Sequence, residues 1–188
     1  MRLQGTLMSI LLIWAVTAQA EVHEKLTQSQ YDVRGDDHSS LLSVLNAATP
    51  IVFEGKKYHA FTSWNVRWNF RWFAEADGRC RITSAAIDLT SNMRLPNLIG
   101  GSTQQRQAFY PYLSALRTHE SGHYQLGKDA ADAIDRGIQG LQVAATCREL
   151  ERNANALGDR LLAEYRTRER QYDQSTDYGK TQGASLTR

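Results

Sequence analysis

The chain has 188 residues, with 22 Lys and Arg against 20 Asp and Glu, and a formal net charge of +2 at pH 7. Because the basic residues are spread among acidic ones and form no run, the charge pattern does not predict a nucleic acid as partner. The length is that of one ordinary domain, which can bury a core without needing several disulfides.

The first twenty residues have the three parts of a secretory signal peptide. Arg2 lies near the start, an apolar run extends from Leu7 to Val16, and the small-residue site Ala18-Gln19-Ala20 follows. The apolar run is shorter than the roughly 20 residues that span a bilayer, and no comparable run occurs later in the chain. We therefore expect cleavage after Ala20 and a secreted or periplasmic mature chain without a transmembrane segment.

The next part of the chain predicts strands. A short strand at 31–33 precedes a helix at 40–47, which Asp37 can cap and Pro50 ends. From Thr62 to Trp72, apolar and β-favouring residues alternate with polar ones, which indicates a long half-buried strand with an aromatic inner face. This face is more typical of core than of a carbohydrate or peptide platform, although the edge of such a strand can bind an extended peptide.

A hairpin is expected to follow this strand. Asp77-Gly78 is a turn signal, and residues 80–90 predict the returning strand. The alternation slips around residues 84–86, which a β-bulge would explain. Pro96 is expected to close the strand region, and residues 97–101 to form a connector.

The second half of the chain predicts helices. Ser102 or Thr103 can cap a run in which apolar residues recur at three- and four-residue spacing. Pro111 breaks or kinks this run, so the helix after it is expected to start there. A second long helix is expected from Arg148 to about Tyr172.

Together these elements predict an α+β fold, in which a small antiparallel sheet packs against the helical half. We assign residues 1–20 to the signal peptide and residues 21–173 to a single domain. The polar tail, residues 174–188, is expected to be partly disordered unless the core captures it as part of that domain.

The chain has two cysteines, Cys80 and Cys147. They are too far apart in sequence to form a CxxC redox or zinc motif. An even number of cysteines in an exported chain favours a disulfide over a metal site or a reactive thiol.

The segment His119-Glu120-Ser121-Gly122-His123 has the HExxH pattern of zinc hydrolases. Two histidines four residues apart lie on one helix face about 6 Å apart, so both imidazoles can bind one Zn²⁺ at about 2.1 Å. Glu120 projects about 100° round the helix from His119, close enough to take a proton from a metal-activated water. The alternative is that both histidines are exposed, or satisfied within the core, on an amphipathic helix.

A catalytic zinc also needs a third protein ligand. The extended motif HExxHxxGxxH is absent, because this chain has Leu126 and Asp129 where the motif has glycine and histidine. In a continuing helix Asp129 lies about 9 Å along the axis from His123 and cannot reach the ion, unless Gly127 ends the helix. The other oxygen donors considered are Glu149, Glu151, Glu164, Asp173 and Tyr178, of which the helix glutamates are expected to face solvent.

Several segments of the chain form a recognisable combination: Trp64-Asn65-Val66-Arg67-Trp68, Cys80, Leu95-Pro96, the segment from Leu116 to His123, Cys147 and the tail from Tyr172 to Ala184. Together they resemble the bacterial domain-of-unknown-function family 922, described as predicted secreted zinc-dependent proteases. The resemblance implies export, a Cys80–Cys147 disulfide, metal ligation by His119 and His123, and Glu120 as general base. The tail of that family often has Thr-x-His-Gly where this chain has Thr176-Asp177-Tyr178-Gly179, so Asp173 and Tyr178, as a tyrosinate, are the candidate third ligands.

The expected function is a secreted zinc-dependent metallopeptidase that acts on a peptide or protein substrate, with Glu120 as general base. A non-catalytic envelope protein that binds a metal or a partner is the alternative, because the motif supplies no obvious third ligand. Metal-dependent hydrolysis of another bond, such as an amide in cell-wall material, is a third possibility.

Overall fold

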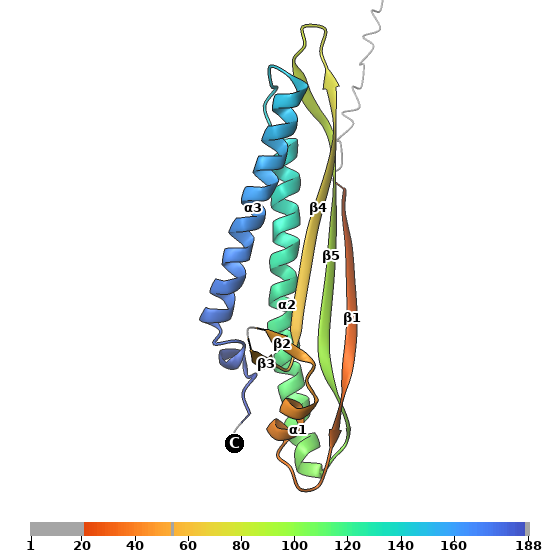
Figure 1. The fold of residues 1–188 in the computed structure, drawn as a ribbon, viewed down its shortest axis with the longest axis vertical. Helices are drawn as coiled ribbons and strands as arrows, with labels where there is room; N and C mark the ends of the chain where they lie inside the picture. Colours follow the sequence, from red (N-terminus) through yellow and green to blue (C-terminus); the bar gives the residue numbers. More distant parts are fainter. Residues whose placement is uncertain (1–20, 54, 187–188) are drawn as a thin grey trace, which may run out of the picture.

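Three long strands and two long helices run side by side along the length of the molecule (Figure 1). The computed structural model describes residues 21–53 and 55–186, so the predicted signal peptide lies outside the described residues. The elements are β1 (Glu21–Gly35), α1 (Leu41–Ala48), β2 (Ile51–Phe53), β3 (Lys56–Tyr58), β4 (Phe61–Ala74), β5 (Cys80–Gly100), α2 (Thr103–Gln139), α3 (Cys147–Ser175) and the 3₁₀ turn η1 (Lys180–Gln182).

The predicted α+β class is confirmed. The three-stranded sheet has the order β1-β5-β4. Helix α2 packs along this sheet, and α3 packs against α2 and also contacts β4 (Figure 1). The β4–β5 hairpin is antiparallel as expected, whereas β1 pairs with β5 in parallel, so the sheet is mixed. A parallel pair needs a long crossover, which the segment from α1 to β4 supplies.

The alternation predicted for residues 62–72 is that of β4. Thr62 and Val66 are buried, Trp64 and Trp68 are half-buried, and the residues between them face solvent. The register of β4 on β5 shifts between Arg71 and Trp72. This bulge lies opposite residues 82–84, slightly before the segment in which it was expected.

The prediction that Pro96 closes the strand region is wrong, because β5 continues to Gly100. The last pair of the β4–β5 ladder is Phe61 with Arg94. Beyond Arg94, β5 therefore has β1 on one side only, and a residue without an N–H can be accommodated where a central strand would not accept it.

Two expectations for the helices are also wrong. Ser40, and not Asp37, caps α1, and its hydroxyl accepts a bond of 3.2 Å from the Ser43 N–H. Pro111 does not end or start a helix, because α2 runs unbroken from its cap at Ser102. Pro111 is exposed, so water can satisfy the carbonyl that loses its N–H partner, while buried Phe109 and Tyr112 hold both flanks against the core.

The apolar core consists of two main clusters that meet near the middle of α2. One contains Phe109, Leu116 and residues of α1, and the other contains Ala130, Ile134 and residues of α3. Between them lies a layer of buried polar side chains, which comprises Thr62, Ser91, His119, Glu120 and His123. This layer contains the HExxH segment.

The described part of the tail packs against the core, as expected if the tail belongs to the domain. Ala184 is buried in the same cluster as Leu116, and Leu186 packs against that cluster. No described helix is long and apolar enough to cross a bilayer.

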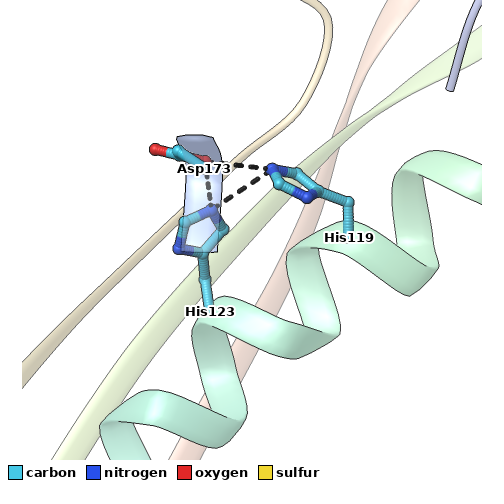
Figure 2. A group of neighbouring side chains, drawn as sticks. All are labelled: His119, His123 and Asp173. Carbon is cyan, nitrogen blue, oxygen red and sulfur yellow. Dashed lines mark hydrogen bonds and ion pairs between the residues drawn. The ribbon is translucent and has the colours of Figure 1, made fainter. Parts of the chain in front are cut away.

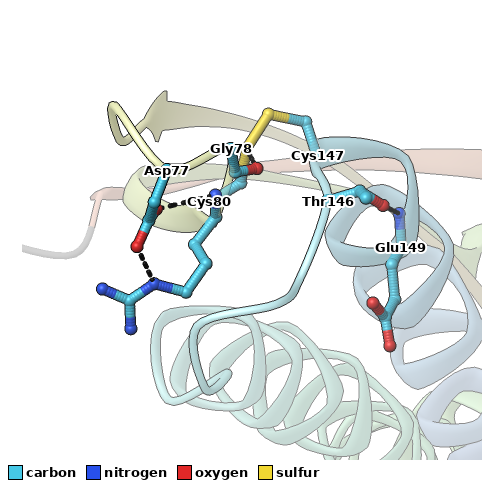
Figure 3. Close-up of a disulfide and its surroundings, with 7 residues drawn as sticks. Asp77, Gly78, Cys80, Thr146, Cys147 and Glu149 are labelled. Carbon is cyan, nitrogen blue, oxygen red and sulfur yellow. Dashed lines mark hydrogen bonds and ion pairs between the residues drawn. A yellow bond between two sulfur atoms is a disulfide. The ribbon is translucent and has the colours of Figure 1, made fainter.

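The predicted Cys80–Cys147 disulfide is present and joins the start of β5 to the start of α3 (Figure 3). The two Cα atoms are 5.0 Å apart. Cys80 also exchanges two backbone hydrogen bonds of 2.9 Å with Ala144. Thr146 caps α3 by accepting from the Glu149 N–H, so the bridge lies at a well-defined helix start.

Replacing both cysteines with serine is expected to lower the free energy of unfolding by about 4 kcal/mol in the chain-entropy model, because the bridge closes a long loop. The bridged residues are 67 positions apart. Urea denaturation of wild type and of the double variant measures the loss, and wild type in reductant should match the variant. A loss below about 1 kcal/mol would contradict the assignment of a stabilising role.

Candidate metal centre

Three side chains from two helices converge on one point (Figure 2). His119 and His123 lie one turn apart in the middle of α2, and Asp173 lies in the last turn of α3. Asp173 Oδ1 is 3.2 Å from His119 Nε2 and 3.0 Å from His123 Nε2. The two Nε2 atoms are 3.3 Å apart. The structure thus brings Asp173, one of the two candidates from the tail region, to the histidine pair.

This triangle has the dimensions of a zinc site. Two ligand atoms of a regular tetrahedron around Zn²⁺, with bonds of about 2.0–2.1 Å, lie about 3.3–3.4 Å apart. The three separations, 3.0, 3.2 and 3.3 Å, are close to that value. Two imidazole nitrogens and one carboxylate oxygen also form a donor set that zinc accepts in hydrolases. The residues present therefore fit a zinc ion.

The other candidate third ligand, Tyr178, does not join this group. The residue is 48% exposed, and its ring centroid lies 6.3 Å from that of Tyr58. Its backbone N–H donates to the Asp173 carbonyl at 2.8 Å, so Tyr178 contributes to the turn after Asp173 through its main chain. Asp129 accepts from the Gln125 side chain, and α2 continues past Gly127, so Asp129 lies outside the group. Glu164 pairs with Arg168 on the surface, as expected for a helix glutamate.

Each imidazole is oriented by an acceptor at its second nitrogen. Nδ1 of His119 is 3.0 Å from Gln182 Oε1, and Nδ1 of His123 is 3.3 Å from Glu169 Oε1. A proton held at Nδ1 by these acceptors would leave Nε2 of each ring as the nitrogen that binds a metal. Sequence reasoning missed Gln182 and Glu169, and the only signal for Gln182 was the resemblance of the tail.

Tyr172 holds the tail, both histidines and α2 together. Its ring stacks on that of His119, with centroids 5.1 Å apart and planes at 10°, and it is perpendicular to His123. Its hydroxyl donates to the His119 carbonyl at 3.2 Å and accepts from Gln182 Nε2 at 3.0 Å. A Cβ at position 122 would lie 2.1 Å from this hydroxyl oxygen, so Gly122 within HExxH permits the close approach.

Glu120 points into the buried polar layer. The residue is 4% exposed, and its Oε2 has no hydrogen-bond partner among the described residues. Burial raises the pKa of this carboxyl, whereas the Thr62 hydroxyl and the two imidazoles lower it. The Thr62 hydroxyl lies near the Glu120 carboxyl, but it makes no hydrogen bond of good geometry to this carboxyl or to any other described residue. A buried carboxyl oxygen without a hydrogen-bond partner lowers the stability of the fold, and such atoms are typical of functional sites.

His123 and Asp173 have strongly shifted pKa values in the centre without a metal. Burial lowers the pKa of His123, but its hydrogen bonds to Asp173 and Glu169 outweigh that effect and raise the pKa to about 9. Burial raises the pKa of Asp173, but the hydrogen bonds from His119 and His123 hold it well below its usual value. Without metal, His123 is therefore an imidazolium at neutral pH, paired with the Asp173 carboxylate.

The fold and the centre define an α+β protein with a candidate metal site of two histidines and one aspartate. The model of the family of bacterial proteins of unknown function, DUF922, matches residues 28–180, and the chain belongs to that family. The matched segment includes His119, His123, Glu169 and Asp173, and it ends before Gln182. No curated protein and no solved structure matches the chain.

Gly122→Ala is expected to destabilise the protein by about 1–3 kcal/mol, because the new methyl group overlaps the Tyr172 ring. Alanine is the better helix former by about 1 kcal/mol, so a net loss identifies the clash. Ser121→Ala, at an exposed neighbouring position, is the control and should change the free energy of unfolding by less than about 0.5 kcal/mol. Urea denaturation measures both, and equal stability of the two variants would contradict the contact.

Zinc affinity is expected to rise with pH, by about tenfold per pH unit between pH 7.5 and 8.5, and to level off above the His123 pKa of about 9. The metal must displace the proton from His123 Nε2. As the pH rises, fewer molecules carry this proton, so it competes less with the metal. Calorimetric titration in buffers of different ionisation enthalpy should show about one proton released per zinc bound at pH 8. An affinity that is flat over this range would contradict the raised pKa.

Proposed function

We propose that the protein is a secreted zinc-dependent hydrolase that cleaves peptide bonds. The observation that carries the proposal is the triangle of His119 Nε2, His123 Nε2 and Asp173 Oδ1, with the buried carboxyl of Glu120 next in sequence to His119. The same segment would be an unusual choice for a purely structural core, because it inserts ionisable groups between two apolar clusters.

The three ligands would hold zinc as a catalytic site does. Structural zinc sites have four protein ligands, whereas catalytic sites have three and leave one position for water or substrate. When bound, zinc acts as a Lewis acid that polarises a carbonyl and lowers the pKa of water. The aspartate and the two neutral imidazoles balance part of the charge of the ion, and Gln182 and Glu169 keep both rings aligned.

Glu120 would act as the general base. Its unpaired Oε2 is a free acceptor for a proton of the attacking water, and the same oxygen can return that proton to the leaving amine. Burial raises its pKa toward the range in which a carboxylate is an effective base near neutral pH. Its position on the turn of α2 that carries His119 keeps it beside the reacting groups without making it a ligand.

The edge of the sheet favours a peptide as substrate. β4 is paired with β5 on one side and is an edge strand of the described three-stranded sheet. Thr62, near the start of β4, lies beside Glu120, so the edge passes close to the candidate centre. An extended peptide can add to such an edge through main-chain hydrogen bonds, which would present its backbone carbonyls to the site.

Glu120→Gln is expected to keep zinc but lower the rate of peptide hydrolysis by about 10²–10⁴-fold, because the amide cannot accept the proton. His119→Ala should lose both zinc and activity, since it removes a ligand. The exposed helix residue Glu151 provides the matched control, and Glu151→Gln should change neither. Elemental analysis and cleavage of a peptide library measure the two effects, and full activity in Glu120→Gln would contradict the mechanism.

A non-catalytic metal-binding protein of the cell envelope is the second candidate. The observation that favours it is the near-complete burial of Glu120. This residue is 4% exposed, and its carboxyl would need an opening to meet a substrate. Stoichiometric zinc together with no cleavage of a broad peptide library would support this candidate. Zymography on casein and on peptidoglycan side by side separates a peptidase from an enzyme that cleaves cell-wall amides.

A further inference from the structure

Trp64 on β4 and Glu169 on α3 meet next to the candidate centre. The indole N–H of Trp64 donates to Glu169 Oε1 at 2.6 Å. The same oxygen lies 3.3 Å from His123 Nδ1. One carboxylate oxygen therefore accepts from both the sheet and the metal-ligand helix.

The position of the indole is fixed by close packing. A Cβ on Gly127 would lie 2.7 Å from Trp64 Cγ, so the glycine provides the space that the ring occupies against α2. Trp64 also packs against the apolar cluster that contains Ala130 and Ile134. The donor atom thus comes from a rigid strand and a packed ring, and it offers Glu169 a defined partner.

Glu169 cannot bind the same metal ion as Nε2 of His123. Glu169 Oε1 is bonded at Nδ1, on the other side of the imidazole ring from the nitrogen that faces Asp173. Its effect is on the ring: a carboxylate at Nδ1 favours a proton there, so that Nε2 is the nitrogen available to a metal, and it makes Nε2 a better donor to that metal.

We propose that Trp64 and Glu169 are positioning residues for His123, through which the sheet sets the orientation and the tautomer of a ligand on α2. This inference rests on the metal centre of the proposed function and not on the reaction that the centre performs. It also assigns a role to the Trp64 indole N–H that packing alone does not require.

A second indole on β4 makes a similar contact with α3 that involves no histidine. Trp68 lies four residues along β4 on the same face, and its indole N–H donates to Asn155 Oδ1 on α3 at 3.0 Å. A Cβ on Gly158 would lie 2.5 Å from its ring, so this indole too fits against a glycine. Trp68 thus repeats the sheet-to-helix contact of Trp64 away from the metal ligands.

The test compares Trp64→Phe with Trp68→Phe, because each keeps an aromatic ring and removes one indole N–H. Zinc affinity is measured by competition with a chelator, and the His123 Nδ1 proton is followed by ¹⁵N NMR in the zinc-loaded full chain. Trp64→Phe should weaken zinc binding by about tenfold and shift the His123 Nδ1 resonance, whereas Trp68→Phe should change the affinity by less than about twofold. Glu169→Gln should weaken binding by about 10–100-fold.

A double-variant cycle separates positioning from general loss of packing. In a Glu169→Ala background, Trp64→Phe should have no further effect on zinc affinity, since the indole acts only through the carboxylate. Equal zinc affinity and an unchanged Nδ1 resonance in Trp64→Phe would overturn the inference while leaving the metal centre intact. Wild-type protein that binds no zinc would instead overturn the proposed function, and this inference with it.

Discussion

The docking of the last turn of α3 on the middle of α2 is the contact on which the candidate centre depends. Gly122 permits the Tyr172 ring to lie against α2, and the next residue, Asp173, then reaches both imidazoles. The disulfide anchors α3 at its other end, about 40 Å along the helix axis from Asp173. The long helix is thus fixed at both ends, by a covalent bond and by the polar cluster.

The centre lies in a layer of buried polar side chains between two apolar clusters. Thr62, Ser91 and Glu120 contribute buried oxygen atoms that have no hydrogen-bond partner among the described residues. Such groups lower stability, and proteins keep them mainly where function needs them. The apolar clusters on either side hold this layer in place, and their burial offsets the loss of stability that the buried polar groups cause.

The three structural layers meet at this point. The sheet contributes Trp64, α2 contributes the histidines, and α3 contributes Glu169 and Asp173. The tail adds Gln182, which lies just beyond the part of the chain that the family model matches. A residue outside that segment thus orients His119, so the candidate centre includes a contribution that the family match alone does not reveal.

The sequence by itself determined the features that depend on the local spacing of residues, or on a residue type that occurs in one possible pair. The alternation of β4, the helix face that carries His119 and His123, and the pairing of the only two cysteines all followed from spacing or count. The parallel pairing of β1, the continuation of β5 through Pro96 and the continuation of α2 through Pro111 depended on which neighbours each segment has. The choice of Asp173 over Tyr178 depended on how α3 docks on α2. Only tertiary structure decided these features, because segments far apart in the chain form those contacts and no local pattern encodes their geometry.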